Sequence, residues 1–327
     1  MRARRRLACL AVAALAGCSA DGGADPHFDL AVSTTDQGLT DSGVLDAAMV
    51  VDLLPADLQH TADAAMGDGG VSNGCPLCPS PAAGKVCVTG RLFDFVTNAP
   101  LSAGQKTVRV SLHDAVSFAV NTTGTPIAEA SSDKGCFTFD NLTPTSSGLL
   151  VLAAGDPTSG AQQLQLAYSV VPVVADQVFV ADLYTLPKSV VASWSTAASA
   201  DYASSGAYVA FFVDAQVPQV TNNTMPTASF LAGVSLQNTA GLGAAKYLGA
   251  TRNTFDTALT ATGPLGGVVA ASGNLLGTVS GQNGTCMNGG TSHACKWETH
   301  VAGLGAGAIL IDRLFDCTAT PTTPSCQ

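Results

Sequence analysis

The feature that most constrains the fold is a repeated alternation of apolar and polar residues in short runs. From Lys85 the chain reads KVCVTGRLFDFVTNAPLSAGQKTVRVSLHD, and turn-forming residues separate the alternating runs. A period of two is typical of half-buried β-strands, because successive side chains point to opposite faces of a sheet. We expect one core to hold Val86, Val88, Val108, Val110 and Leu112.

The same pattern predicts further strands up to residue 184. These strands are expected at residues 136–139, 148–153, 164–171 and 178–184. The turn SSDKG (Ser131–Gly135) ends in a glycine that can adopt a positive φ. Phe137 and Phe139 lie two apart and therefore point to the same face of their strand. Many short strands at regular spacing predict a sandwich of two sheets.

Residues 85–155 resemble the carboxypeptidase regulatory-like domain, which has a transthyretin-like, seven-stranded sandwich fold. The matching positions are Gly90, Asp94, Pro100, Leu101, Gly104, Gly135, Phe137, Phe139, Asn141 and Leu142. The sequence departs from the family pattern at Ser131 and Ser132, where Thr-Asp is usual, and in a longer segment over residues 113–126. The resemblance implies an accessory or surface domain and supplies no active site.

A short helix and a second copy of this plan are expected in residues 188–327. LPKSVVASWSTAAS places one apolar stripe on a helix behind Pro187, with Gly206 beyond its end. The stripe consists of Val190, Val191, Trp194, Ala197 and Ala198. GAYVAFFVDA (Gly206–Ala215) then matches the first strand, with Asp214 in the place of Asp94.

Later segments of the second copy are shorter matches. LAGVSL (Leu231–Leu236) and TGPLGGV (Thr262–Val268) are similar to a strand and a turn of the first copy, and the last strands are expected at residues 295–301 and 308–315. The predicted fold is mostly β, with tandem Ig-like or transthyretin-like β-sandwiches after a disordered N-terminal tether. The predicted divisions are residues 1–17, 18–72, 73–187 and 188–327.

The N-terminus resembles a bacterial lipoprotein signal. Four arginines precede the apolar stretch Leu7–Gly17, whose eleven residues fall short of the roughly 20 that a membrane-spanning helix needs. Leu15-Ala16-Gly17-Cys18 is similar to a lipobox, which implies lipidation of Cys18 after the signal is cut. Ser19 favours delivery to the outer membrane, and the face of the membrane is left open. An ordinary signal peptide with a chance cysteine is the alternative.

The segment after Cys18 is strongly acidic. Residues 19–72 contain ten Asp and no Lys, Arg or Glu, whereas residues 73–327 carry 14 acidic and 10 basic side chains. Self-repulsion and the lack of a sustained apolar period predict a disordered tether. Calcium-binding repeats would need a Gly-rich context that is missing. The acidic balance also argues against nucleic-acid partners, whose phosphates require Lys and Arg.

Eight cysteines follow the signal and predict disulfides, as is usual in exported proteins. They are Cys75, Cys78, Cys87, Cys136, Cys286, Cys295, Cys317 and Cys326. We expect pairing within the first four and within the last four, where Cys286–Cys295 and Cys317–Cys326 would close short loops; the connectivity is left open, and a Cys87–Cys136 pair would be a longer crosslink. A redox-active or zinc-binding role for the CPLC segment is disfavoured, because prolines follow it directly and a second spaced pair is missing.

Catalytic motifs are scarce. HExxH and P-loop motifs are absent, and the only GxSxG match (Gly70–Gly74) places Ser72 beside the acidic linker without the flanking strand and helix that a nucleophile elbow needs. The glycines of GLGAGAILID (Gly303–Asp312) precede a predicted strand, which is the wrong order for a dinucleotide site. We predict no catalytic residue, cofactor or metal.

The strand CKWETH contains two side chains that can ligate a metal, Glu298 and His300. Lys296, Glu298 and His300 share one face, which we expect to be solvated, because no third metal ligand can be identified. Trp297 points to the other face and is expected in the core. A sugar-stacking role for Trp297 or Trp194 is the alternative.

The predicted function is that of a non-enzymatic, lipid-anchored protein of the bacterial cell envelope, whose β-sandwich modules make structural or adhesive contacts. Its expected partners are the membrane, through the anchor, and an envelope or extracellular protein. A ligand-binding lipoprotein for peptide or carbohydrate is the alternative, and an unrecognised hydrolase is a third possibility.

Overall fold

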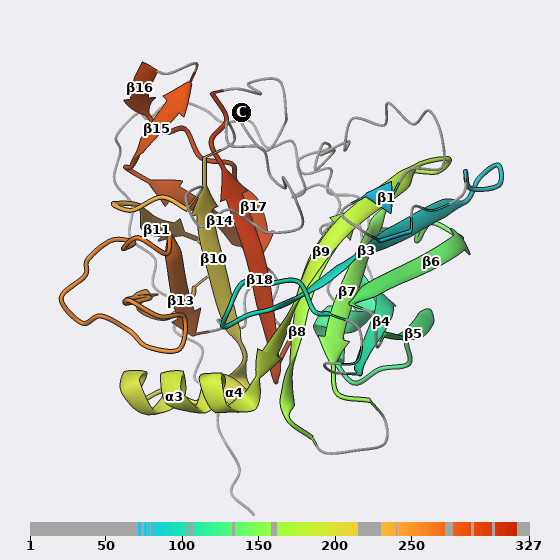
Figure 1. Ribbon diagram of the computed structural model, residues 1–327, viewed down its shortest axis with the longest axis horizontal. Coiled ribbons are helices and arrows are strands. Elements are labelled where there is room, and N and C mark those ends of the chain that lie inside the picture. Colours follow the sequence, from blue (N-terminus) through green and yellow to red (C-terminus); the bar gives the residue numbers. More distant parts are fainter. Residues whose placement is uncertain are drawn as a thin grey trace, which may run out of the picture. The chain divides into compact units, whose positions relative to one another are not determined.

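A computed structural model describes residues 71–318, except 73–74, 77, 79, 103, 105–106, 133–134, 158–161, 215–229, 240, 272–276, 289–290 and 303–304. The chain is mostly β, as the alternating pattern predicts (Figure 1). Among the described helices, none combines the length and the apolar character needed to cross a membrane. The signal, Cys18 and Cys326 lie outside the described residues. The predicted linker extends to residue 72, but Val71–Ser72 (β1) pairs with Cys75–Pro76 (β2).

Residues 86–187, the N-terminal half, form a sandwich of two sheets. Its strands are β3 (Val86–Asp94), β4 (Val108–Asp114), β5 (Ala128–Ser132), β6 (Cys136–Leu142), β7 (Leu149–Gly155), β8 (Leu164–Pro172) and β9 (Val178–Pro187). One sheet has the order β6-β3-β9 and the other β5-β4-β7-β8, and short pairing between β8 and β9 joins them. The strands predicted from the alternation are therefore confirmed.

The core of this half lies between its two sheets. All five predicted core side chains are buried in one cluster, together with Phe137 and Phe139. The rings of Phe137 and Phe139 lie 6.2 Å apart, so neighbouring positions of one strand face supply much of the aromatic area. The alternation thus identifies both the strands and the face that each one buries.

Two glycines of the family pattern are required by close backbone contacts. Gly90 lies where a Cβ would overlap the carbonyl oxygen of Ala181 on β9. Gly135 has a φ of 73°, in the left-handed region, and its Cβ would overlap the carbonyl of Leu101. The longer segment over residues 113–126 contains the helix α2 (Ala115–Val120), which begins where Asp114 accepts a hydrogen bond from the Ser117 N–H.

Residues 188–318, the C-terminal half, begin with the predicted helix. The elements are α3 (Lys188–Ala198), α4 (Tyr202–Ser205), β10 (Ala207–Val213), β11 (Ser235–Asn238), β12 (Lys246–Tyr247), β13 (Gly267–Ala271), β14 (Gly277–Gln282), β15 (Thr285–Asn288), β16 (Thr291–Ala294), β17 (His300–Ala302) and β18 (Ala308–Phe315). Val190, Val191 and Trp194 of α3 are buried as predicted, whereas Ala197 is exposed.

One sheet of this half has the order β12-β13-β10-β18, and a second, β11-β14-β17, packs across it. Phe212 and Leu314 from the first sheet and Val279 from the second meet in one core cluster. Trp297 joins that cluster and its ring lies 5.0 Å from that of Phe212. Both tryptophans therefore serve the interior, as Trp194 is also fully buried.

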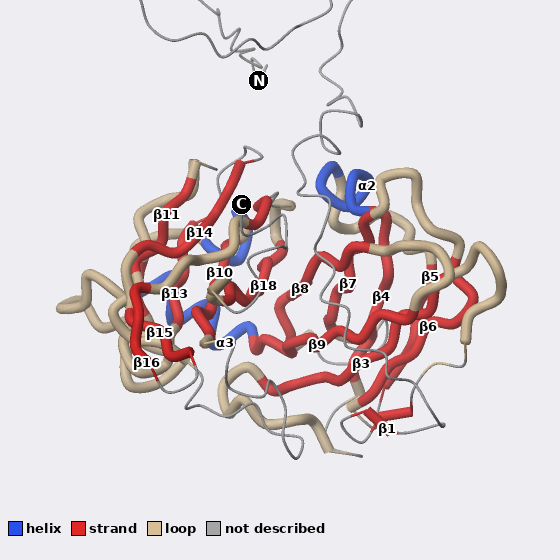
Figure 2. The backbone as a smooth tube through the Cα atoms, turned by 90° about the horizontal axis from the view of Figure 1, so that it is seen from above, coloured by secondary structure: helices blue, strands red, loops and turns tan. Residues whose placement is uncertain are grey.

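The two halves share a continuous sheet. β18 pairs in parallel with β8 of the N-terminal half, so strands on both sides of Pro187 belong to one eleven-stranded sheet (Figure 2). A third core cluster lies between α3, the outer face of β3 and β9, and one face of β10 and β18. The expected boundary at residues 187 and 188 coincides with the start of α3, but it does not separate two independent sheets.

The predicted second copy resembles the first in the pairing of its first strand and differs from it in the later strands. β3 lies between an antiparallel partner, β6, and a parallel one, β9, and β10 likewise lies between antiparallel β13 and parallel β18. The expected strand at residues 231–236 is displaced to Ser235–Asn238. Residues 295–299 form only an isolated bridge at Trp297, so the predicted strand at residues 295–301 is reduced to His300–Ala302.

Candidate functional site

Two carboxylates hold the ring of His300 in the C-terminal half. His300 Nδ1 lies 2.8 Å from Asp312 Oδ2, and Nε2 lies 3.2 Å from Glu298 Oε2. The hydroxyl of Tyr208 on β10 donates to the same oxygen of Asp312 at 3.2 Å. The side chains of His300 and Glu298 are only 12% and 4% exposed. We call these four residues the His300 cluster.

The carboxylates keep His300 protonated. Burial lowers the pKa of the imidazole, but Asp312 and Glu298 together outweigh burial and raise that pKa to about 10. A protonated imidazole donates from both nitrogens, which matches its two carboxylate contacts. Such a ring has no lone pair with which to accept a proton at neutral pH, so the cluster is a charged crosslink and not a general base.

The prediction from the sequence for residues 295–300 is wrong in part. Lys296, Glu298 and His300 were expected on a solvated strand face, which is wrong for Glu298, because it is buried and accepts a hydrogen bond from the Phe315 N–H at 3.2 Å. The missed partner is Asp312. Its signal is present in AILIDRLF, where Asp312 and Arg313 interrupt an otherwise apolar strand. The carboxylates occupy different ring nitrogens, so they do not converge on one metal position.

A second charged group lies where β3, β9 and β18 meet. Arg91 of β3 is the register partner of Asp182 on β9, and Arg313 reaches across from β18. Arg313 Nη1 lies 3.3 Å from Asp182 Oδ2, and Nη2 lies 3.4 Å from the Tyr184 hydroxyl. Arg91 is 8% exposed, and its Nη1 has no hydrogen-bond partner. We call Arg91, Asp182, Tyr184 and Arg313 the arginine seam.

Arg252 lies inside the aromatic cluster behind this seam. Its guanidinium carbon is 4.4 Å from the centre of the Phe211 ring and 5.5 Å from that of Phe95, and Nη1 donates to the Phe95 carbonyl at 3.1 Å. The Trp194 indole donates to the Arg252 carbonyl at 3.0 Å. Cation–π contacts from rings of both halves thus stabilise one buried charge at their junction.

Three described disulfides and one further bonded cysteine account for the cysteines between residues 75 and 318. Cys75 pairs with Cys136, Cys78 with Cys87, and Cys286 with Cys295. The longer Cys87–Cys136 crosslink that the sequence left open is therefore wrong, because strand β2 brings Cys75 to β6 instead. Cys317 is also disulfide-bonded. Its expected partner, Cys326, lies outside the described residues, so that pairing stays a prediction.

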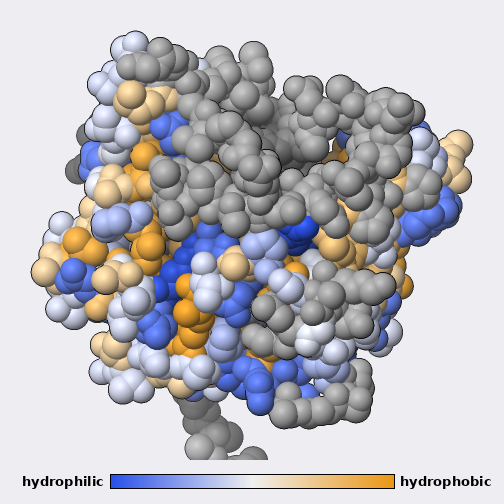
Figure 3. Space-filling model, in the orientation of Figure 1, coloured by the Kyte–Doolittle hydropathy of each residue, from blue (hydrophilic) through white to orange (hydrophobic). Residues whose placement is uncertain are grey.

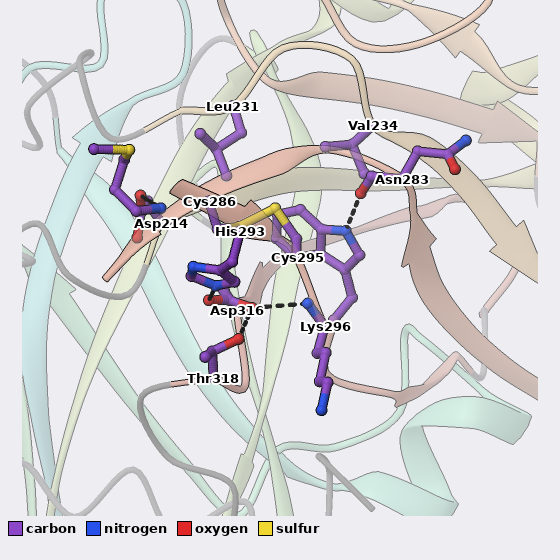
Figure 4. Close-up of a disulfide and its surroundings, with 12 residues drawn as sticks. Asp214, Leu231, Val234, Asn283, Cys286, His293, Cys295, Lys296, Asp316 and Thr318 are labelled. Atoms are coloured by element: carbon purple, nitrogen blue, oxygen red, sulfur yellow. Dashed lines mark hydrogen bonds and ion pairs between the residues drawn. A yellow bond between two sulfur atoms is a disulfide. The ribbon is translucent and has the colours of Figure 1, made fainter. Parts of the chain in front are cut away.

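A His–Asp pair lies beside the Cys286–Cys295 disulfide (Figure 4). His293 Nε2 is 2.8 Å from Asp316 Oδ2, and the other oxygen of Asp316 accepts from the Lys296 N–H at 2.8 Å. A sulfur of Cys286 lies within 4.8 Å of the His293 and Asp316 ligand atoms. Because that sulfur is bonded to Cys295, it is not a thiolate, and two remaining ligands are too few for a zinc site.

Comparison with known proteins gives no family. No family model matches the chain, and no curated protein matches it. Among solved structures it is similar to the TIE protein of Bacillus anthracis, with 10% identity, a TM-score of 0.22, and coverage of 71% of this chain and 34% of that one. The chain thus spans about a third of the length of that protein.

Two further solved structures are similar over larger shares of their own length. A candidate carbohydrate-binding protein from Pseudomonas aeruginosa is 17% identical, with a TM-score of 0.21 and coverage of 32% of this chain and 91% of that one. A minor pilin of Streptococcus agalactiae is 12% identical, with a TM-score of 0.21 and coverage of 70% and 95%.

Proposed function

We propose that this protein is a non-enzymatic, lipid-anchored component of the cell envelope, whose disulfide-crosslinked β-sandwich makes structural or adhesive contacts. The observation that supports this role is the His300 cluster. It gathers a histidine, two acidic side chains and a tyrosine, and each of them is paired with another member. Because both ring nitrogens of His300 already face carboxylates, the arrangement favours a structural ion pair.

Anchoring is proposed from the sequence. Cys18 follows a short apolar run and the residues Leu15-Ala16-Gly17, and the acidic segment 19–72 then separates it from the described sandwich. The disulfides agree with an oxidising compartment outside the cytoplasm. The anchor would hold the sandwich at the membrane surface, and the acidic tether would set its reach.

The experiment is metabolic labelling with an alkyne fatty acid, followed by detergent phase partition. The wild-type protein should carry the label and enter the detergent phase, and Cys18→Ala should lose both properties. Cys9→Ala is the matched control, because Cys9 lies inside the signal and should be dispensable. Unlabelled wild-type protein would overturn the anchor. Protease treatment of intact cells, read by mass spectrometry of peptides from residues 85–327, then tests outward display.

A ligand-binding role is the second candidate function. The observation that favours it is Arg91, whose guanidinium is almost fully buried and has an unsatisfied Nη1. Buried charges in folded proteins are normally paired, so an unpaired one requires an explanation. Binding of an anionic group at this position would provide it.

A further inference from the structure

The arginine seam carries more positive than negative charge. Arg313 donates from Nη1 to Asp182 Oδ2 at 3.3 Å and from Nη2 to the Tyr184 hydroxyl at 3.4 Å. Asp182 attracts Arg91 from the neighbouring strand, but burial dominates and lowers the pKa of the Arg91 guanidinium. Two guanidiniums therefore share one carboxylate, and the nearby Arg252 is balanced by the attraction of Asp94, so the group has one surplus positive charge.

This arrangement is costly unless something else pairs with Arg91. Removing a guanidinium from water without a partner is strongly unfavourable, and the pull of Asp182 is already shared with Arg313. Natural proteins retain such groups where binding requires them, since pairing with a ligand then recovers the lost interaction. Nη1 of Arg91 is the atom that such a ligand would satisfy.

The seam lies near the surface. The side chains of Arg313 and Asp182 are 17% and 14% exposed, and Arg91 is 8% exposed. Figure 3 shows hydrophilic residues gathered in the middle of one face, over β9 and β18. Arg313 and Asp182 therefore keep part of their side chains in contact with solvent, whereas Nη1 of Arg91 is buried.

The charge and shape of the seam select one type of anion. One surplus positive charge favours a monoanion, and Asp182 repels the second charge of a phosphate dianion. A guanidinium presents two parallel N–H donors that match the two oxygens of a carboxylate. The hydroxyl of Tyr184 accepts from Arg313 and donates to Asn98 Oδ1, so the ligand is bound by guanidinium donors.

We propose that the arginine seam binds the carboxylate group of a small acidic ligand, with Arg91 as the residue that contacts it. The inference rests on the second candidate function and is independent of the anchor. Sources of the carboxylate are an acidic sugar or a simple carboxylic acid. The seam joins β3 and β9 to β18, so the ligand would bind at the junction of the two halves.

The test is isothermal titration calorimetry of the full-length protein, extracted in nonionic detergent and kept in a buffer free of carboxylates and phosphate. The titrants are D-glucuronate, acetate, glucose and phosphate. Glucuronate should bind and neutral glucose should not, with phosphate weaker than glucuronate. Binding of acetate as tightly as glucuronate would assign a simple carboxylate, and preference for glucuronate would assign an acidic sugar.

Variants distinguish the seam from other basic sites. Arg91→Gln should weaken glucuronate binding at least tenfold, whereas Asp182→Asn should tighten it because a competing carboxylate is removed. Lys85→Gln is the control, since the Lys85 ammonium donates to the Thr143 hydroxyl at an exposed position, and it should leave binding unchanged.

Three results would overturn the proposal. They are a wild-type protein that binds no carboxylate at millimolar concentrations, an Arg91→Gln variant that binds as tightly as wild type, and an Arg91→Gln variant that fails to fold. The last result would make Arg91 structural. None of the three affects fatty-acid labelling at Cys18, so failure of this inference and failure of the anchor are separable.

Discussion

The two halves start from the same strand arrangement and are stabilised in different ways. β3 and β10 each lie between one antiparallel and one parallel partner. The N-terminal half then closes two sheets over an apolar core and ties its first segment down with two disulfides. The C-terminal half has shorter strands and contains the His300 cluster.

Irregular strand pairing in the C-terminal half leaves buried polar groups that must be satisfied by side chains. Where strands are long, as in β3 and β9, backbone pairing is continuous over eight residue pairs and most side chains facing the core are apolar. Where pairing fails, as over residues 295–299, the chain buries polar groups and must satisfy them with one another. Buried charge is not confined to such interruptions, since Arg91 and Asp182 are partners within the regular β3–β9 ladder.

Removing a whole disulfide, by replacing both of its cysteines, should give the largest loss of unfolding free energy. The Cys75–Cys136 crosslink spans 61 positions, whereas Cys78–Cys87 and Cys286–Cys295 each span 9. The loop-entropy model gives losses of about 4 kcal/mol for the long crosslink and about 3 kcal/mol for each short one. Double Cys→Ser variants and urea unfolding measure these losses.

The two short disulfides form the control within that series, because their loops have equal length in opposite halves. Equal losses would show that the chain constraint dominates in both halves. A clearly larger loss at Cys286–Cys295 would show that the adjacent His293–Asp316 pair depends on it. A smaller loss for Cys75–Cys136 than for either short disulfide would contradict the prediction.

Breaking the His300 cluster should destabilise the C-terminal half by about 3 kcal/mol, since removal of one partner leaves a buried charge incompletely compensated. The variant is Glu298→Ala, and Glu298→Gln should lose less stability than Glu298→Ala, because an amide removes the charge but keeps a hydrogen-bond acceptor for His300 and for the Phe315 N–H. Urea unfolding gives the size of the loss. Amide hydrogen exchange should become faster in β17 and β18. An unchanged unfolding free energy for Glu298→Ala would show that the cluster is solvated.

The cluster should also make the C-terminal half sensitive to alkaline pH. The pKa of His300 is raised to about 10 in the fold, against about 6.5 in an unfolded chain. Its stabilising contribution is therefore fully present below about pH 6.5 and is lost as the pH rises through about 10. Between pH 7 and 9 the loss should reach about 2 kcal/mol, measured by urea unfolding at each pH.

In the N-terminal half, His113 should give the opposite pH dependence of stability, because its pKa is lowered and not raised. Burial, followed by Arg109, lowers the pKa of His113, while Glu129 opposes them. Its contribution is therefore present above about pH 6.5 and is lost as the pH falls through the lowered pKa. His300→Gln should abolish the alkaline loss, and His113→Gln should leave that loss in place. An alkaline loss that survives in His300→Gln would assign it to another group.

The sequence predicts the fold where side chains alternate and fails where contacts come from distant residues. Val86 to Leu112 alternate regularly, so their strands and core face follow from local geometry. Glu298 reads as a solvated residue because its partners, His300 and the Phe315 N–H, are brought together only by tertiary packing. The parallel pairing of β8 and β18 joins residues about 140 positions apart and has no local signal.

The smallest expected effect is at the exposed ion pair of the N-terminal half. Arg109 Nη1 lies 3.3 Å from Glu129 Oε1, and both side chains are partly exposed on β4 and β5. Water screens this pair, so Glu129→Gln should change the free energy of unfolding by less than about 0.5 kcal/mol in urea. The same change from carboxylate to amide at Glu298 removes charge from a buried pair and should cost more. Equal losses of unfolding free energy for Glu129→Gln and Glu298→Gln would contradict this prediction, because they would show that burial does not strengthen the ion pair of Glu298.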